Sequence, residues 1–309
     1  MGLTNNQLQL INAVCQNKMT DVKKMAILCL KEDKTAKNQY QVKRYLNILE
    51  NADNSGLMEI PYQIKGMINV EDSSKFRVDR YYLSERESDL AERVEKLNDA
   101  GLKLMEMGIP YLNSILLTGV SGTGKTTFGR YMANRLDLPF LYINFSYLID
   151  SYMGGTGKNI RQVFDYARLN KCLLMLDEID AIASIRTSGS SGTDKERATS
   201  TITLIQELDK IQNDTIIIGA TNIPQDIDPA IKRRFAISHE VKIFDAQENQ
   251  QMVLQYLNTT GLNYNQDDIN SFIRKMPAHT PQAVILNKVV ECIAKCIIEN
   301  SDTIQLSSE

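Results

Sequence analysis

The stretch Gly119-Val120-Ser121-Gly122-Thr123-Gly124-Lys125-Thr126 says most about this chain. It fits the pattern G-x-x-x-x-G-K-[ST] and follows an apolar run, Ile115-Leu116-Leu117, that predicts a strand. Such glycines let main-chain N–H groups approach phosphates, the lysine reaches the terminal phosphates, and the hydroxyl of Thr126 can bind Mg²⁺ at a helix start. We expect this stretch and the adjacent Thr127 to bind a nucleoside triphosphate; a glycine-rich turn without a ligand is the alternative.

Strand and helix patterns alternate around this stretch. Strands are expected over 114–118, 140–145, 172–176 and 215–219, and helices over 125–136, 159–168 and 198–211. Such alternation predicts an α/β fold in which helices cover a parallel sheet. The strands that end at Leu176 and Gly219 are apolar without alternation, which places them in the middle of the sheet. Functional loops should gather at the carboxyl ends of these strands.

Three regions are expected along the chain. Residues 1–75 contain three short amphipathic helical patterns and predict a small helical module, for partner recognition or ring support. Residues 76–243 hold the alternating strands and helices of a nucleotide-binding domain. Residues 244–309 return to helical patterns with breaks at Gly261, Pro277 and Pro281, which predicts a separate helical lid.

Composition narrows the class of protein. The chain has 309 residues, 43% of them hydrophobic and 24% charged, and its longest apolar runs are far shorter than the roughly 20 residues needed to cross a bilayer. No signal-peptide pattern begins the sequence, so we expect a cytoplasmic protein without a membrane partner. A formal net charge of -3 gives no global reason to expect nucleic-acid binding.

The cysteines do not predict a disulfide framework or a zinc site. There are five, with no C-x-x-C pair, and only His239 and His279 could add imidazole ligands. Cys292 and Cys296 are four residues apart in a helical pattern, and we expect both to face a core.

Two carboxylates end the strand expected over 172–176. Asp177 would hold Mg²⁺ together with Thr126, and Glu178 would orient and polarise the attacking water. An acidic pair at a strand end often occurs by chance, but here it follows a phosphate loop at a suitable distance.

Polar residues also follow the next strand. Asn222 could position water near the γ-phosphate, although an asparagine there is otherwise a turn former. Arg233 and Arg234 then stand beside the apolar Phe235, where the alternative is a solvated basic turn.

Four motifs in this order, GVSGTGKT, LLMLDEIDAI, GATN and IDPAIKRRF, resemble the AAA family of the AAA+ ATPases over roughly residues 80–309. The resemblance implies a P-loop NTPase fold with a five-stranded parallel sheet flanked by helices and a C-terminal helical lid, and it implies ATP and Mg²⁺ as cofactors. It makes Asn222 the sensor 1 residue. It makes Arg233 and Arg234 arginine fingers that reach the nucleotide of a neighbouring subunit in a homo-oligomer, expected to be a hexameric ring.

The resemblance also gives meaning to Tyr152, Met153 and Gly154. Related unfoldases have an aromatic-hydrophobic-Gly loop there that contacts the polypeptide substrate in a central pore, whereas the bland alternative is a turn before a helix. The chain departs from the family's pattern in two places: Gly-Val-Ser-Gly replaces Gly-Pro-Pro-Gly, and no sensor 2 arginine is found at 280–283. Tyr81 and Tyr82 lie where the family cradles the base, although tyrosines pack in cores as often.

We therefore expect an oligomeric, Mg²⁺-dependent ATPase that remodels, unfolds or translocates a protein partner. An ATP-dependent assembly switch that recruits or gates a separate effector, such as a protease or nuclease, shares every nucleotide residue. A DNA-loading ATPase fits less well because the composition is acidic, and a small-molecule kinase would not need Asn222 followed by paired arginines.

Overall fold

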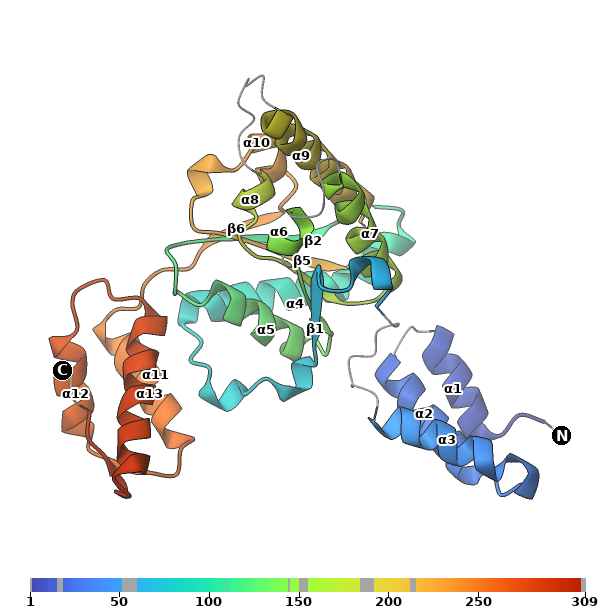
Figure 1. Ribbon diagram of the computed structural model, residues 1–309, viewed down its shortest axis with the longest axis horizontal. Coiled ribbons are helices and arrows are strands. Elements are labelled where there is room, and N and C mark those ends of the chain that lie inside the picture. Colours follow the sequence, from blue (N-terminus) through green and yellow to red (C-terminus); the bar gives the residue numbers. More distant parts are fainter. Residues whose placement is uncertain are drawn as a thin grey trace.

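The computed structural model describes residues 2–15, 19–51, 60–109, 111–143, 145–149, 155–183, 192–211 and 215–306. An N-terminal helical bundle, an α/β domain and a C-terminal helical region follow one another along the molecule (Figure 1). Tyr152, Met153 and Gly154, expected to contact substrate, lie outside the described residues.

A six-stranded sheet forms the centre of the molecule, with the strand order β1-β3-β4-β5-β2-β6. The strands are β1 (Ile68–Glu71), β2 (Asn113–Thr118), β3 (Phe140–Ile143), β4 (Leu173–Leu176), β5 (Ile216–Thr221) and β6 (Ile237–Glu240). All neighbours pair in parallel except β1, which runs antiparallel to β3 at the edge. The predicted α/β fold with five parallel strands is confirmed, and β1 is an additional antiparallel strand.

Helices cover both faces of this sheet, as Figure 1 shows for α4 and α5 on one side and α7 and α9 on the other. Successive side chains of a strand point to opposite faces. Leu174 and Leu176 accordingly belong to the core beneath α7 and α9, while Leu173 and Met175 belong to the core beneath α4 and α5. All four are fully buried, as expected for a central parallel strand.

The α/β domain contains the three helices expected over 125–136, 159–168 and 198–211, as α5, α7 and α9, and further helices that were not expected. In chain order the helices are α4 (Glu85–Glu106), α5 (Lys125–Arg135), α6 (Phe145–Ile149), α7 (Thr156–Leu169), α8 (Asp180–Ala183), α9 (Gly192–Lys210) and α10 (Pro229–Lys232), with short 3-10 turns η2 (Tyr62–Ile64), η3 (Ser73–Lys75), η4 (Val78–Arg80) and η5 (Pro224–Asp226). The helices that follow β2, β3 and β4 cross back to the side of the sheet where the next parallel strand begins. All five parallel strands therefore end on the same side, and the functional loops follow their carboxyl ends.

The edge strand β1 is fastened to the domain by an ion pair as well as by strand pairing. Glu71 accepts hydrogen bonds from Arg130 of α5 at 2.7 and 3.0 Å. Residues 68–71 precede the domain boundary expected near residue 76, so we propose that the α/β domain begins before β1.

The two outer regions are helical. The N-terminal bundle consists of α1 (Asn5–Cys15), α2 (Met19–Glu32), the 3-10 turn η1 (Ala36–Asn38) and α3 (Gln39–Asn51). The C-terminal region, the lid, consists of α11 (Ala246–Asn258), α12 (Gln266–Lys275), α13 (Gln282–Ile298) and the short parallel strands β7 (Asn263–Tyr264) and β8 (Thr303–Ile304). Cys292 and Cys296 are buried in the core of the lid, as expected, and neither forms a disulfide.

Within the described part of the chain, no helix combines the length and the apolar character that crossing a bilayer requires.

Candidate nucleotide-binding site

The phosphate loop joins the end of β2 to the start of α5. Gly119, Gly122 and Gly124 all have positive φ angles, a conformation that side chains disfavour. At Gly119 the space is also closed, because a Cβ atom would lie 2.3 Å from the carbonyl oxygen of Val241. The predicted glycine positions therefore meet two physical needs: a left-handed backbone and, at Gly119, close approach of another main chain.

Lys125 begins α5, and its side chain turns back over the loop. Its Nζ donates to the carbonyl oxygens of Gly119 and Val120 at 2.8 and 2.9 Å and to Oδ1 of Asn222 at 2.7 Å. Burial lowers the pKa of Lys125, whereas the nearby carboxylates of Asp177 and Asp180 act to raise it. The ammonium group is thus held where phosphate oxygens could replace its protein acceptors.

Thr126 and Asp177 come together beside this lysine. The Thr126 hydroxyl donates to Oδ2 of Asp177 at 2.5 Å, which joins the start of α5 to the end of β4. Hydroxyl and carboxylate oxygens are hard ligands, and Mg²⁺ in nucleotide sites commonly takes only one or two protein ligands, with waters and phosphates as the others. The donor set therefore fits Mg²⁺, and no cluster of three or more His, Cys, Asp or Glu residues occurs among the described residues as a separate metal cage.

Glu178 follows Asp177 in a strained backbone conformation. Its φ angle is +50°, in the left-handed region that costs a non-glycine residue on the order of 1 kcal/mol or more. Its main-chain N–H donates to Oδ1 of Asp177 at 3.0 Å, and the next N–H, of Ile179, donates to the carbonyl oxygen of Ala220 on β5. These contacts hold the turn after β4 so that both carboxylates line the same cavity.

That cavity has a volume of about 400 Å³ and lies at the carboxyl ends of β2, β4 and β5. Its polar end is formed by Ser121 to Thr127 together with Asp177, Glu178 and Asn222. Gly119 and Val120 contribute instead as acceptors for Lys125. The structure therefore brings together the loop, the carboxylates and the asparagine that the sequence placed far apart along the chain.

The other end of the cavity is lined by apolar side chains beside a few polar ones, and most of these residues belong to no local sequence motif. Tyr81 and Tyr82 line it, as the family resemblance implied, and Phe244, Met252 and Leu286 from the lid side join them. Tyr81 also packs against Tyr131 of α5 with ring centroids 5.2 Å apart, so it serves the core and the cavity together. An apolar end opposite a phosphate-binding end suits a nucleoside base.

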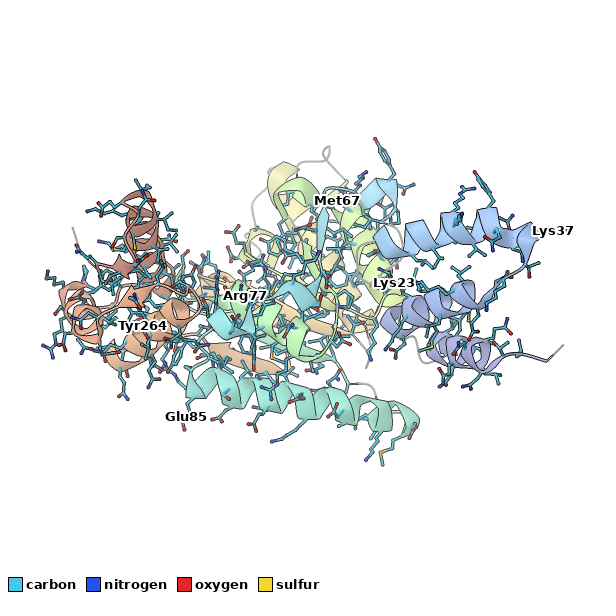
Figure 2. The ribbon with its side chains drawn as sticks, turned by 90° about the horizontal axis from the view of Figure 1, so that it is seen from below. Lys23, Lys37, Met67, Arg77, Glu85 and Tyr264 are labelled. Atoms are coloured by element: carbon cyan, nitrogen blue, oxygen red, sulfur yellow. The ribbon has the colours of Figure 1, made fainter. Side chains whose placement is uncertain are left out.

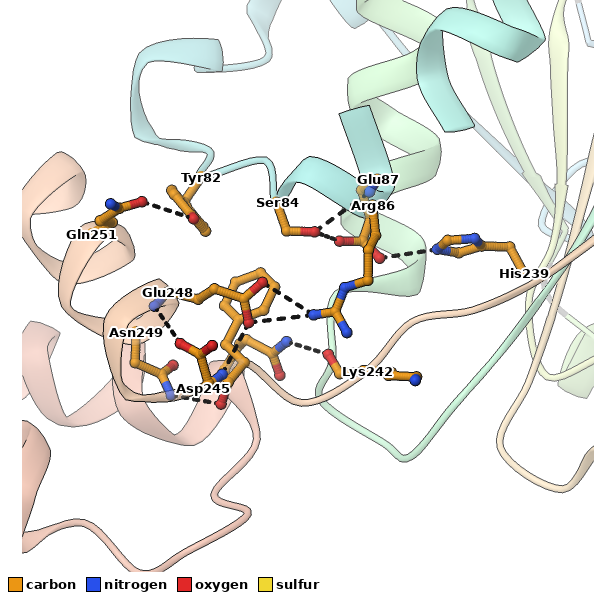
Figure 3. A network of polar contacts seen from close by, with 12 residues as sticks. Tyr82, Ser84, Arg86, Glu87, His239, Lys242, Asp245, Glu248, Asn249 and Gln251 are labelled. Carbon is orange, nitrogen blue, oxygen red and sulfur yellow. Dashed lines mark hydrogen bonds and ion pairs between the residues drawn. The ribbon is translucent and has the colours of Figure 1, made fainter. Parts of the chain in front are cut away.

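The lid makes direct contacts with the phosphate loop and with the 80–87 segment. The main-chain N–H of Ala283, in the first turn of α13, donates to the carbonyl oxygen of Gly122 in the phosphate loop at 3.0 Å. Figure 3 shows the neighbouring polar contacts, in which Arg86 pairs with Glu248 at 3.1 Å and the Tyr82 hydroxyl donates to Gln251 at 2.9 Å. Both are contacts of the 80–87 segment with α11.

A buried carboxylate also lines the cavity. Glu87 is 3% exposed and contacts the hydroxyl of Ser84 and, at 3.0 Å, Nε2 of His239 on β6 (Figure 3). No local pattern marks Glu87 or His239 in the sequence, because 152 residues separate them and only the fold joins them.

Arg233 and Arg234 do not line this cavity. The guanidinium group of Arg234 donates to both carboxylate oxygens of Asp209 on α9 at 3.0 Å. Arg233 is exposed, and its Nε donates to the carbonyl oxygen of Pro229 at 3.2 Å. Neither arginine therefore contributes to the lining of the nucleotide cavity of its own chain.

Comparison with known proteins also indicates an ATPase domain. Residues 115–243 match the family described as "ATPase family associated with various cellular activities (AAA)". The 26S proteasome regulatory subunit 10B homolog A of Arabidopsis thaliana is 34% identical over 161 residues, covering 51% of this chain and 40% of that protein. The ATP-dependent zinc metalloprotease FtsH of Chloroflexus aggregans is 34% identical over 167 residues, covering 53% and 25%.

A third relative, the AAA family ATPase y4kL of Sinorhizobium fredii, is 36% identical over 146 residues, covering 47% of this chain and 43% of that protein. The match spans less than half the length of each of these relatives. Residues 115–243, the part of the chain that holds the phosphate loop, the paired carboxylates and the asparagine, thus match the AAA family of ATPases.

Proposed function

We propose that the chain hydrolyses ATP with Mg²⁺ in an oligomer and uses that hydrolysis to remodel a protein partner. The observation that carries the proposal is the convergence of Lys125, the Thr126–Asp177 pair, Glu178 and Asn222 on one cavity, while Arg233 and Arg234 lie outside it. One chain offers nearly every group that phosphoryl transfer needs, except a cation at the outer side of the γ-phosphate.

Each group has a role that follows from its chemistry. Thr126 and Asp177 would hold Mg²⁺, which neutralises phosphate charge when bound. Lys125 compensates the charge of the terminal phosphates, Asn222 positions the attacking water, and Glu178 polarises that water. Because Lys125 already donates to Asn222, an entering phosphate would change the contacts of both side chains at once.

Assembly completes the site in this proposal. A guanidinium group that approaches developing phosphate charge from a neighbouring subunit contributes on the order of 10³ to 10⁵ in rate. Lys125→Ala and Arg233→Ala proteins would each be inactive alone, one lacking nucleotide binding and the other the finger. Mixing them should restore part of the ATP turnover, because a Lys125-bearing cavity then meets an intact Arg233. Turnover by either variant alone, or none in any mixture that still assembles, would count against a shared site.

Remodelling of a polypeptide is the finer part of the proposal. It is supported by the family and by relatives named as a proteasome regulatory subunit and a protease. A hexameric ring, a cytoplasmic setting and substrate contact through Tyr152, Met153 and Gly154 stay predictions.

The test for threading compares Tyr152→Ala with Tyr62→Ala, a matched tyrosine that is 87% exposed elsewhere. ATP turnover should survive both changes, and unfolding of a bound fluorescent partner should fail only with Tyr152→Ala. Unfolding that survives Tyr152→Ala would refute threading. A partner that responds instead to Glu178→Gln, which holds ATP without turnover, would favour the switch that gates a separate effector.

A further inference from the structure

Charge is distributed unevenly between the N-terminal bundle and the remainder of the chain. Residues 1–51 contain eight Lys or Arg and four Asp or Glu, a net charge of +4, whereas the remaining residues contain 27 and 34, a net charge of -7. The overall net charge of -3 is therefore the sum of a basic N-terminal bundle and an acidic remainder, which we call the acidic body. Sign asymmetry of this kind is a physical cue to a partner surface.

The exposed face of α3 concentrates this positive charge around an aromatic ring. Tyr40, Lys43 and Arg44 have the i, i+3, i+4 spacing that places side chains on one side of a helix, and Lys37 lies in the turn just before it. Tyr40 is 78% exposed, and the three cations are exposed as well. A solvated helix face commonly carries lysine, but a tyrosine exposed to this extent among cations has apolar area to bury.

Two of the four acidic residues of the bundle accept hydrogen bonds from neutral groups and do not pair with these cations. Asp33 accepts hydrogen bonds from the Thr35 N–H and the Asn38 side chain, both at 2.8 Å, and these contacts lower its pKa. Glu32 accepts from Asn6 at 2.6 Å. Among the ion pairs of the described residues, none involves Lys37, Lys43 or Arg44. The positive charge on this face is therefore open to a partner.

The face also lies where a partner can reach it. Figure 2 places Lys37 at the end of the bundle farthest from the α/β domain, and α3 begins two residues later. At physiological ionic strength, interactions between exposed charges fade over about 8 Å. A short ligand on this end of α3 would respond to the local cations, while one long enough to follow the molecule would meet its acidic body.

We propose that the α3 face formed by Lys37, Tyr40, Lys43 and Arg44 binds a short acidic segment of a polypeptide. Carboxylates pair with the lysines and the guanidinium group, and an apolar side chain of the segment packs on the Tyr40 ring. The choice of a polypeptide over other polyanions rests on the proposed remodelling function. A long nucleic acid is disfavoured because it extends beyond the basic face into the field of the acidic body.

The test measures binding of fluorescein-labelled peptides to the full chain by anisotropy, using Glu–Ala and Lys–Ala repeats. The Glu–Ala peptide should bind, and its affinity should fall steeply with added salt. The triple change Lys37→Glu, Lys43→Glu, Arg44→Glu should weaken it about tenfold or more, since each exposed pair contributes roughly 0.2–1 kcal/mol.

The matched control is Lys103→Glu, Lys171→Glu, Lys275→Glu, which shifts net charge by the same amount at exposed positions of the acidic body. It should change affinity by less than about twofold if binding is local. Tyr40→Ala should weaken binding while Tyr40→Phe preserves it, and these single changes serve if the triple variant fails to fold. Equal losses in the two triple variants would overturn the proposal.

Two other occupants are outcomes of the same experiment, and each would overturn the proposal. A single-stranded thymidine oligonucleotide that displaces the peptide and binds more tightly would identify a nucleic-acid surface. Salt-sensitive self-association that the α3 triple change abolishes and the peptide does not disturb would identify a second copy as the occupant. ATP turnover is measured on every variant, so that the two proposals can fail separately. Peptide binding without ATP turnover would refute only the proposed ATPase function. ATP turnover without peptide binding would refute only the proposed peptide site on α3.

Discussion

Lys125 and Arg233 are the two cations proposed to meet the same triphosphate, and the structure holds them in opposite ways. Lys125 is 7% exposed and donates to three acceptors of its own chain. Arg233 is exposed at the end of α10, away from the cavity that Lys125 lines. The acceptors of Lys125 thus lie inside a cavity of its own chain, whereas the side chain of Arg233 is exposed to solvent.

The largest expected effect tests the exposed cation. Arg233→Ala should lower kcat for ATP by about 10³ or more and leave nucleotide affinity unchanged, because the guanidinium acts on developing charge and not on the bound ground state. Steady-state turnover and equilibrium binding of a fluorescent ATP analogue would separate the two quantities. Arg233→Lys is the matched control and should recover little turnover, since an ammonium lacks the planar fork. A parallel loss of affinity would place Arg233 in its own chain's site.

Replacement of Lys125 should mainly affect nucleotide affinity, in contrast to replacement of Arg233. Lys125→Ala should weaken nucleotide binding by about 100-fold, because it removes charge-assisted hydrogen bonds to the phosphates. Binding of the same analogue measures it, with the exposed Lys171→Ala as the control. Unchanged affinity would mean that the ammonium of Lys125 does not contact the phosphates.

Gly119 tests the backbone of the phosphate loop, on which the position of Lys125 depends. Gly119→Ala should reduce the free energy of unfolding by about 2–3 kcal/mol, since its Cβ would strike the carbonyl of Val241 in addition to straining φ. Gly66→Ala is the control: its φ is also positive, but nothing lies within 4 Å, so about 1 kcal/mol is expected. Urea denaturation compares them, and equal losses would rule out the contact with Val241.

The pH dependence of binding follows from the burial of Lys125. Only the protonated ammonium attracts phosphate, and burial lowers its pKa from the usual 10.5. Affinity for ATP should therefore be complete below the lowered pKa and should fall by up to about tenfold per pH unit above it. Titrations at alkaline pH would show the fall beginning earlier than for an ordinary lysine. A profile that stays flat to pH 10.5 would contradict the lowered pKa.

The smallest expected change in stability concerns a third cation, Arg130, which we place neither in the phosphate site nor at a subunit contact. Glu71→Gln removes its ion-pair partner, and because both side chains are about one-third exposed we expect a loss of only about 0.5 kcal/mol in the free energy of unfolding. Urea denaturation measures it, with the exposed Glu106→Gln as control. A loss above roughly 2 kcal/mol would mean that the pair behaves as a buried one.

The sequence predicted the parts of the fold that local pattern determines. The strand expected over 114–118 is β2 (Asn113–Thr118), and the apolar runs over 172–176 and 215–219 lie in the buried β4 and β5. The edge strands β1 and β6 were not located, because each is four residues long and mixes polar with apolar residues. An edge strand is recognised by what it pairs with, and pairing is a property of the whole fold.

The residues of the site likewise fall into those that a local motif predicts and those that only the fold brings together. Lys125, Thr126 and Asp177 could be found because their chemistry follows short motifs, and the structure places all three in the lining of one cavity. The apolar end of the cavity could not, apart from Tyr81 and Tyr82. Phe244 and Leu286 are ordinary apolar residues in helical or loop contexts, and only the placement of the lid makes them cavity walls.

The antiparallel strand β1 has a mechanical consequence. The chain between the N-terminal bundle and the sheet arrives at β1, whose four residues pair with β3, and Glu71 adds a second anchor on α5. A pull exerted by cargo on the bundle would therefore load the rim of the sheet along the strand axis, so that several bonds resist together instead of opening one after another. Part of that force would pass through the Glu71–Arg130 pair into α5, the helix that begins with Lys125 of the phosphate loop.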